Sequence, residues 1–169
     1  MVRLKSISRN EHMKKLSREN HFSLLFCWKI RQGLKMGIEM ERISKYVKYF
    51  WQHHLQPHFR EEENIFFAPI KDKIVYRAIN EHEHIKQQIE DLGNYSGNSG
   101  RKKLSKIADM LYEHVRYEER DLFPHLEKKI SKQQLENIGE QIEKHHPSSL
   151  QDQYEDQFWN IKHDKAGKN

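Results

Sequence analysis

The sequence predicts an all-α protein, an up-down-up-down four-helix bundle with an additional C-terminal helix. Apolar residues recur at every third or fourth position through most of the 169-residue chain, which is the spacing of one helix face. Only 36% of the residues are hydrophobic and 33% are charged, as expected where long amphipathic helices each give one stripe to a shared core. Glycine and serine gather in one clear run, GNYSGNSG, so the other connections are short and neighbouring helices should pack antiparallel.

Each of the four predicted helices has an apolar stripe and a signal at its end. The expected spans are 17 to the 33–37 region, 39–67, 72–92 and 101–123. Ser17 is expected to cap the first helix, and Pro57 should kink the second. Gly93 ends the third helix, the run at 93–100 forms a flexible loop, and Pro124 kinks or ends the fourth helix. The stripe expected on the first helix consists of Phe22, Leu24, Leu25, Trp28, Ile30 and Leu34.

A fifth helix is expected to begin at Ser131, where SKQQ resembles a capping box, and to end before Pro147. The tail that follows is expected to dock through Phe158 and Trp159. The chain therefore divides into an N-terminal extension (1–16), a four-helix bundle (17–127), and a C-terminal helix and tail (128–169).

Composition excludes several classes of protein. The chain has one cysteine, Cys27, which excludes an internal disulfide, thiolate zinc sites and iron-sulfur clusters. Cys27 lies in an apolar run and is expected to be a buried thiol. The sequence has no signal peptide and no apolar run of transmembrane length, which predicts a cytoplasmic protein without a membrane partner. The formal charge is +5, but basic residues are scattered among acidic ones, so nucleic acid is not an expected partner.

A repeated segment carries the main functional signal. HFREEENIFFAP begins at His58 and HVRYEERDLFP begins at His114, and both copies have arginine two positions on, glutamate four and five on, and phenylalanine nine on. Residues four apart lie on one helix face, so His58 with Glu62 and His114 with Glu118 each aim the same way. One such pair is usually a solvated surface contact, whereas two in a repeated segment indicate a shared site.

The other two helices also offer histidines near their apolar stripes, His21 on the first and His82 on the third. Taken singly, each is more readily a hydrogen-bonded core residue than a ligand. Four histidines and two glutamates that converge inside one bundle need compensating positive charge, which cations supply. Mixed imidazole and carboxylate ligands suit iron, manganese or zinc, and two carboxylates can bridge a pair of ions.

The chain resembles the hemerythrin-like (HHE cation-binding) proteins over about 17–126. The motifs that carry the resemblance are NHFSLLFCWKIRQGL around His21, HLQPHFREEE around His58, NEHEHI around His82 and EHVRYEERDLFP around His114. The resemblance implies a four-helix bundle with a non-haem di-iron centre, two iron ions that react with or sense O2 or NO. The ligands that it implies are His21, His58, Glu62, His82, His114 and Glu118, with the two glutamates as bridges.

The sequence departs from the oxygen-carrying members of that family in two places. Those proteins have a second histidine one turn from the ligand on the third helix, where this chain has Ala78 and Lys86. Their last carboxylate lies five residues after the histidine of the fourth helix and would select Glu119, whereas the symmetry of the repeat selects Glu118, which we prefer. His54, one turn before His58, is expected either to hydrogen-bond a ligand or to replace one.

Two classes of function stay open at this point. The first is a di-iron binding module that senses or stores O2, NO or iron. The second is a di-iron oxidase, such as a ferroxidase or a peroxide- or NO-handling enzyme. The four-His, two-Glu set is also similar to that of iron-sulfur repair proteins, but these usually bring a further cysteine-bearing domain. Fold and ligand identity do not separate these classes, because function depends on the site and its reactivity.

Overall fold

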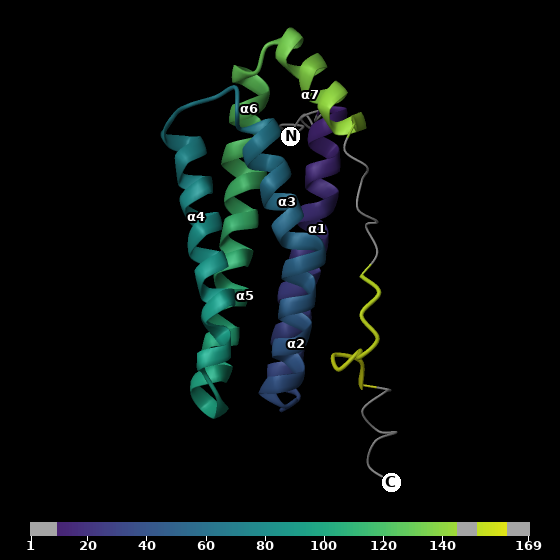
Figure 1. Cartoon of the computed structure of the whole chain (residues 1–169), viewed down its shortest axis with the longest axis vertical. Helices are drawn as coiled ribbons and strands as arrows, with labels where there is room; N and C mark the ends of the chain where they lie inside the picture. The colour runs from purple at the N-terminus through teal and green to yellow at the C-terminus, as the bar shows by residue number, and fades with distance from the viewer. Residues whose placement is uncertain (1–9, 145–151, 162–169) are drawn as a thin grey trace, which may run out of the picture.

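The structure is a computed structural model that describes residues 10–144 and 152–161. The described residues are all-helical, as the sequence predicts, and contain no strand. The long helices lie side by side as a bundle, with α6 and α7 at one end and residues 152–161 beside α2 (Figure 1). The elements, in which η denotes a short π- or 3-10-helical turn, are α1 (Glu11–Lys35), α2 (Met40–Phe50), η1 (Trp51–Leu55), α3 (Gln56–Glu61), η2 (Glu62–Phe66), α4 (Lys73–Glu90), η3 (Asp91–Asn94), α5 (Gly97–Tyr117), η4 (Glu118–Leu122), α6 (Phe123–Lys129) and α7 (Lys132–Lys144).

Helix α1 begins earlier than the sequence predicts. Its cap is Asn10, whose side-chain oxygen accepts a hydrogen bond of 2.9 Å from the backbone N–H of His12. The prediction of Ser17 as the N-cap is therefore wrong, because Ser17 lies inside the helix. Met13 and Leu16, which precede Ser17, are fully buried and extend the apolar stripe towards the N-terminus.

Two prolines follow π-helical turns, Pro57 just before the first repeated segment and Pro124 at the end of the second. From Met40 to Phe66 the chain is continuously helical through α2, η1, α3 and η2, and Pro57 stands in the first turn of α3 directly after a π-helical turn. Pro124 likewise stands in the first turn of α6, directly after the π-helical turn η4. At both prolines the disturbance that the sequence predicts takes the form of a wider turn, and the helix then continues.

The connection between α4 and α5 is shorter than predicted. Residues 93–100 are not a flexible loop, because η3 runs to Asn94 and α5 begins at Gly97. Gly97 has a φ of +53°, a conformation that side chains rarely adopt. A Cβ at Gly100 would lie 2.6 Å from the Cε atom of Met40, so a larger residue there would require the Met40 side chain to move.

The core consists of two apolar clusters separated by a layer of buried polar residues. The cluster near the α1–α2 and α4–α5 connections includes Phe59 and Ile85, and the cluster near α6 and α7 includes Phe66, Ala78 and Leu122. Between them along the helices lie the polar residues buried in this layer, which are Asn20, His58, Glu62, His82, His114 and Glu118.

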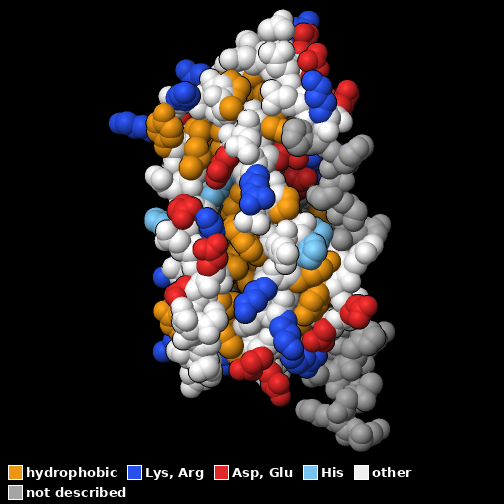
Figure 2. Space-filling view, in the orientation of Figure 1, with side chains coloured by type: hydrophobic (Ala, Val, Ile, Leu, Met, Phe, Trp, Pro, Cys, Tyr) orange, Lys and Arg blue, Asp and Glu red, His pale blue; other side chains and the backbone are white. Residues whose placement is uncertain are grey.

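Surface properties follow from helices with one polar face. On the face seen in Figure 2, Lys and Arg side chains are mixed with Asp and Glu side chains, and hydrophobic side chains show between them. Cys27 is buried as predicted, and burial raises the pKa of its thiol to about 12. None of the helices within the described ranges is long and apolar enough to cross a membrane.

Two predictions about the C-terminal region are confirmed. Ser131 and Gln134 form the reciprocal capping box of α7, with hydrogen bonds of 2.9 and 3.2 Å. Phe158 is 1% exposed and packs with Trp159 against the core between α1 and α2. The Nζ atom of Lys29 lies 2.8 Å from a carboxylate oxygen of Asp152, and both side chains are buried.

This buried ion pair predicts how the docking of the tail responds to pH. Burial raises the pKa of Asp152, but the Lys29 ammonium and the Tyr46 hydroxyl outweigh burial and hold the pKa below its ordinary value. The charged carboxylate therefore stabilises the fold above about pH 4, the pKa of an unfolded aspartate, and this contribution is lost as the pH falls through the lowered folded-state pKa. We expect Asp152→Asn to lower the free energy of unfolding by about 3 kcal/mol at neutral pH, because Lys29 stays buried without its partner.

Urea unfolding of the two proteins at neutral pH and at about pH 3 measures this difference. The difference should shrink at the lower pH, and a difference that is constant with pH would contradict the role of the ion pair. Asp121→Asn is the matched control, because Asp121 is exposed and distant in the sequence from the tail.

Candidate metal centre

Four buried side chains from four elements converge in the polar layer. They are Glu62 of η2, His82 of α4, His114 of α5 and Glu118 of η4, and each offers a ligand atom within 4.8 Å of the others. Both glutamates are 0% exposed. His58 of α3 adjoins this group, with its Nε2 atom 3.0 Å from an oxygen of Glu62. The structure thus brings together five of the six residues that the sequence predicts as ligands.

The two glutamates occupy equivalent places in the backbone. Glu62 is the first residue of η2 and Glu118 is the first residue of η4, each four positions after its histidine. Short π-helical turns inside α-helices occur frequently at functional sites. The repeat in the sequence is therefore also a repeat in local structure.

Each of the three buried histidines has a second glutamate at its outer nitrogen, Nδ1. The pairs are His58 with Glu19 at 2.6 Å, His82 with Glu63 at 2.7 Å and His114 with Glu81 at 3.3 Å. A carboxylate at Nδ1 holds a proton on that nitrogen, which leaves Nε2 as the nitrogen that faces the cluster and can bind a metal. This arrangement orients all three rings and makes them better metal ligands.

The inner atoms of the cluster make no hydrogen bond of good geometry to any described residue, although His58 and His82 each place Nε2 3.0–3.1 Å from an oxygen of Glu62. They are both carboxylate oxygens of Glu62, both of Glu118, and the Nε2 atoms of His82 and His114. Each unsatisfied buried polar group costs about 1–3 kcal/mol, and more where it is charged. A bound cation would give these atoms a partner, and imidazole nitrogen with carboxylate oxygen is a donor set that suits iron, manganese or zinc. The residues present therefore fit a bound metal.

Without an ion, protons must balance the buried carboxylates. Burial lowers the pKa of His58, but Glu62 and Glu19 outweigh it and raise that pKa well above its ordinary value. Burial also opposes charge on His82, yet Glu118, Glu62 and Glu63 raise its pKa to about 10. Metal and protons therefore compete for the same Nε2 atoms.

The two glutamates of the cluster differ in their affinity for protons. Burial and the nearby Glu118 raise the pKa of Glu62. Burial also works against charge on Glu118, but His114 holds the pKa of Glu118 well below its ordinary value. Glu62 therefore takes up a proton more readily than Glu118 does.

His21 does not reach the cluster, which corrects the sequence-based expectation that it points inward. The side chain of His21 is exposed, while its neighbour Asn20 is 1% exposed. Leu25 and Trp28, which belong to the predicted stripe, are also exposed, at 37% and 49%. The rest of the predicted stripe does contact the core, because Ile30 is fully buried and Phe22, Leu24 and Leu34 pack against it partly buried. The fully buried face that passes the cluster runs through Met13, Leu16, Asn20, Ser23, Cys27 and Ile30, and His21 lies one position away from it.

The structure also distinguishes the two candidate carboxylates of the last segment, Glu118 and Glu119. Glu118 lies in the cluster, whereas the two oxygens of Glu119 accept hydrogen bonds from Asn20 Nδ2 at 3.2 Å and from Ser17 Oγ at 3.1 Å. His54 lies outside the cluster. It is half-buried beside the rings of Tyr49 and Phe50, and its Nε2 atom has no hydrogen-bond partner within the described part of the chain.

The sequence interpretation missed the outer glutamates, although a signal for them was present. Glu63 and Glu119 stand at the same position of the repeat, five residues after the histidine. Glu19 immediately precedes the buried Asn20, and Glu81 immediately precedes the buried His82. Of these signals, only the one for Glu19 requires that the inward face of α1 be known.

Two grooves reach the histidines from the surface. One, of about 170 Å³, lies against α3 and α4 and is lined by Glu63 and His82 among others. The other, of about 350 Å³, lies between α4 and α5 and is lined by Glu81 and His114 among others. The ring of Phe59 is stacked on His82 with 3.8 Å between ring centroids, which leaves little room on that side. Openings of this kind suit ions and small molecules.

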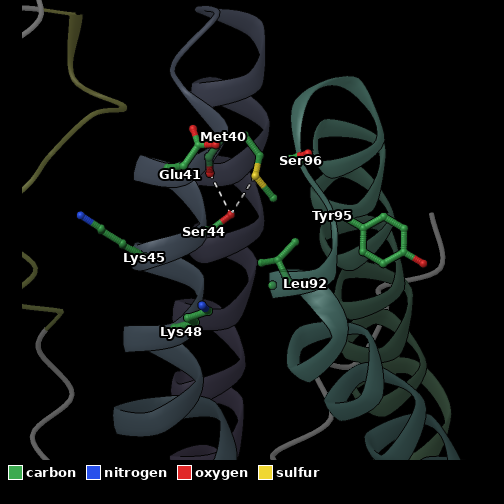
Figure 3. A pocket seen from close by; sticks show the side chains of 9 residues that line it. Met40, Glu41, Ser44, Lys45, Lys48, Leu92, Tyr95 and Ser96 are labelled. Carbon is green, nitrogen blue, oxygen red and sulfur yellow. Dashed lines mark hydrogen bonds between the residues drawn. The ribbon is translucent and has the colours of Figure 1, made fainter.

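A third groove, of about 380 Å³, lies near the connection between α4 and α5 (Figure 3). Its wall includes Met40 and Ser44 of α2, and Ser44 Oγ donates a hydrogen bond of 2.8 Å to the backbone oxygen of Met40. Leu92 faces the groove, whereas Lys45 points away from it (Figure 3). None of its lining residues belongs to the cluster.

Comparison with known proteins agrees with the geometry of the cluster. The family model of the hemerythrin HHE cation-binding domain matches residues 16–126, which include every residue of the cluster and all of its outer glutamates. No curated protein and no solved structure matches the chain. The matched region covers well over half of the 169 residues, and the chain therefore belongs to the hemerythrin HHE cation-binding domain family.

Proposed function

We propose that the protein binds two iron ions in the polar layer and uses them to react with or sense O2 or NO. The proposed ligands are His58, Glu62, His82, His114 and Glu118, with the two glutamates as bridges and the four long helical segments in up-down-up-down order. The observation that carries the proposal is the convergence of six buried nitrogen and oxygen atoms without hydrogen-bond partners. Family membership supports the choice of a cation, and the donor set supports iron.

The chain itself supplies charge, orientation and exclusion of water. Glu62 and Glu118 supply the negative charge that a cation balances. The outer glutamates hold each imidazole with Nε2 inward, which fixes the direction of every nitrogen ligand. The apolar clusters on both sides of the polar layer keep bulk water away, while the two grooves admit small molecules. When bound, iron would supply electrons to an incoming diatomic molecule.

Metal analysis with paired variants tests this proposal. Protein purified from iron-replete cells should contain iron, and Glu118→Ala should lose most of it, because a ligand and a buried charge are removed together. His21→Ala should keep full occupancy, because His21 is exposed and lies outside the cluster. Unchanged iron content in Glu118→Ala, or loss of iron in His21→Ala, would contradict the assignment of ligands.

The role of the centre is tested by reaction with gas under single and multiple turnover. We expect anaerobic protein reconstituted with ferrous iron to change its visible absorption when O2 or NO is added, once per centre. Continued consumption of O2 or NO with excess reductant would instead identify an enzyme. Glu118→Ala is the control in both assays, because it should lack the metal that responds.

A further inference from the structure

We propose that the two halves of the centre bind metal unequally, because Asn20 stands where an internal symmetry calls for an imidazole. This inference rests on the proposed metal binding and specifies it further. One ion would bind tightly between His82 and His114. A second would bind more weakly beside His58 and Asn20, which is 1% exposed.

The internal symmetry relates the two repeated segments. It also relates the glutamates that directly follow the ligand glutamates, Glu63 and Glu119. Glu63, after Glu62, lies 2.7 Å from Nδ1 of His82 on α4. Glu119, after Glu118, accepts a hydrogen bond of 3.2 Å from Nδ2 of Asn20 on α1. The same position of the repeat therefore holds a histidine in one half and an asparagine in the other.

The second set of outer glutamates gives the same correspondence. Glu81 immediately precedes His82 and contacts Nδ1 of His114, while Glu19 immediately precedes Asn20 and contacts Nδ1 of His58. Helix α1 thus corresponds to α4, and the α3–η2 segment corresponds to α5–η4. In both sets of contacts the counterpart of His82 is Asn20.

The donors available to the two halves differ as a result. The half with His82 and His114 offers two imidazole nitrogens, and these lie within 4.8 Å of ligand atoms of both bridging glutamates. The other half offers the Nε2 atom of His58 and the amide oxygen of Asn20, which lie 3.1 Å apart. An amide oxygen is a neutral donor that suits magnesium, calcium or manganese better than iron, so the second ion loses one strong ligand.

The hydrogen-bond network around Asn20 fixes this difference in place. The amide nitrogen of Asn20 is directed to Glu119, so the amide oxygen is directed to His58. The amide cannot rotate to release its oxygen without breaking a hydrogen bond to a carboxylate, which is worth more than a neutral one. Asn20 is therefore a built-in part of the second position.

Equilibrium dialysis with ferrous iron under argon, followed by metal analysis, tests the inference on the full chain. The native protein should bind the first ion at least about tenfold more tightly than the second, a scale set by the effect of single changes around metal sites. Asn20→Leu, which has a similar size and no donor, should lose the second ion and keep the first. His21→Ala is the matched control on α1 and should bind as the native protein does.

A second variant restores a strong ligand without a change of shape. Asn20→Asp combined with Glu119→Gln exchanges the amide and the carboxylate between two residues that already contact each other. This double variant should raise the affinity for the second ion at least about tenfold, while Glu119→Gln alone should not. The ratio of the two binding constants is the readout.

The possible outcomes separate the inference from the proposed function. Two ions of equal affinity in the native protein would overturn the inference, as would an unchanged second ion in Asn20→Leu or no gain in the double variant. The inference is supported if the native protein fails to bind a second ion and the double variant binds one. Failure of the native chain to bind any ferrous iron would overturn the proposed function itself.

Discussion

Removal of metal by a chelator is expected to lower the melting temperature of the protein by roughly 10 °C, the largest effect that the structure predicts. A ligand present at about 1,000 times its dissociation constant stabilises a fold by about 4 kcal/mol, and each kcal/mol is worth about 2–4 °C in a chain of this size. The physical reason is that Glu62 and Glu118, both 0% exposed, lose the cation that balances their charge. Calorimetry with and without chelator measures the shift.

The matched control replaces both buried carboxylates with amides of the same shape, which removes their charge. In the double variant Glu62→Gln, Glu118→Gln the buried charges are gone, so we expect the chelator to leave the melting temperature unchanged. Its metal-free form should also melt no lower than the metal-free native protein, because it no longer buries carboxylates that protonated histidines must balance. Equal melting temperatures of the native protein with and without metal would argue against a buried cation at this place.

Replacement of an outer glutamate is expected to weaken metal binding by about 10–100-fold although no ligand is changed. Glu63→Gln is the clearest case, because the Oε1 atom of Glu63 lies 2.7 Å from Nδ1 of His82 and no other carboxylate contact to that atom is seen in the described chain. The amide can still accept a hydrogen bond but no longer adds charge to the pair, so the imidazole becomes a poorer donor.

Competition with a coloured chelator measures this loss of affinity. Glu83→Gln is the control, because Glu83 is an exposed neighbour on α4 whose Oε1 atom accepts a hydrogen bond from Gln87 at 3.3 Å. If Glu63→Gln and Glu83→Gln bind metal with equal affinity, Glu63 does not orient His82.

Local sequence signals predicted the parts of the fold that depend on neighbours along the chain. The capping box at Ser131 and the buried thiol of Cys27 needed only a few adjacent residues. The repeat was also visible, because His58 with Glu62 and His114 with Glu118 are separated by one helical turn. These features agree with the structure.

Three features could not be obtained in this way, and each depends on packing between helices. The first turn of α5 takes in Gly97 and Gly100, whose composition is typical of loops, and Met40 of α2 packs closely against this turn. The start of α1 was missed because Met13 and Leu16 are buried by residues distant in the sequence. The third feature is the orientation of His21, the residue of α1 that was expected to be a ligand.

By itself the sequence determined an all-helical chain of the HHE family with two His-x-x-x-Glu segments that face the same interior. Only the tertiary structure decided which residue of α1 joins them. Consecutive residues on a helix differ in direction by about 100°, so an error of one position turns a side chain from the core to the solvent. Packing of α1 against α5 and α3 buries Asn20 and exposes His21, because a buried amide at that position can donate a hydrogen bond to Glu119 and place its oxygen against Nε2 of His58.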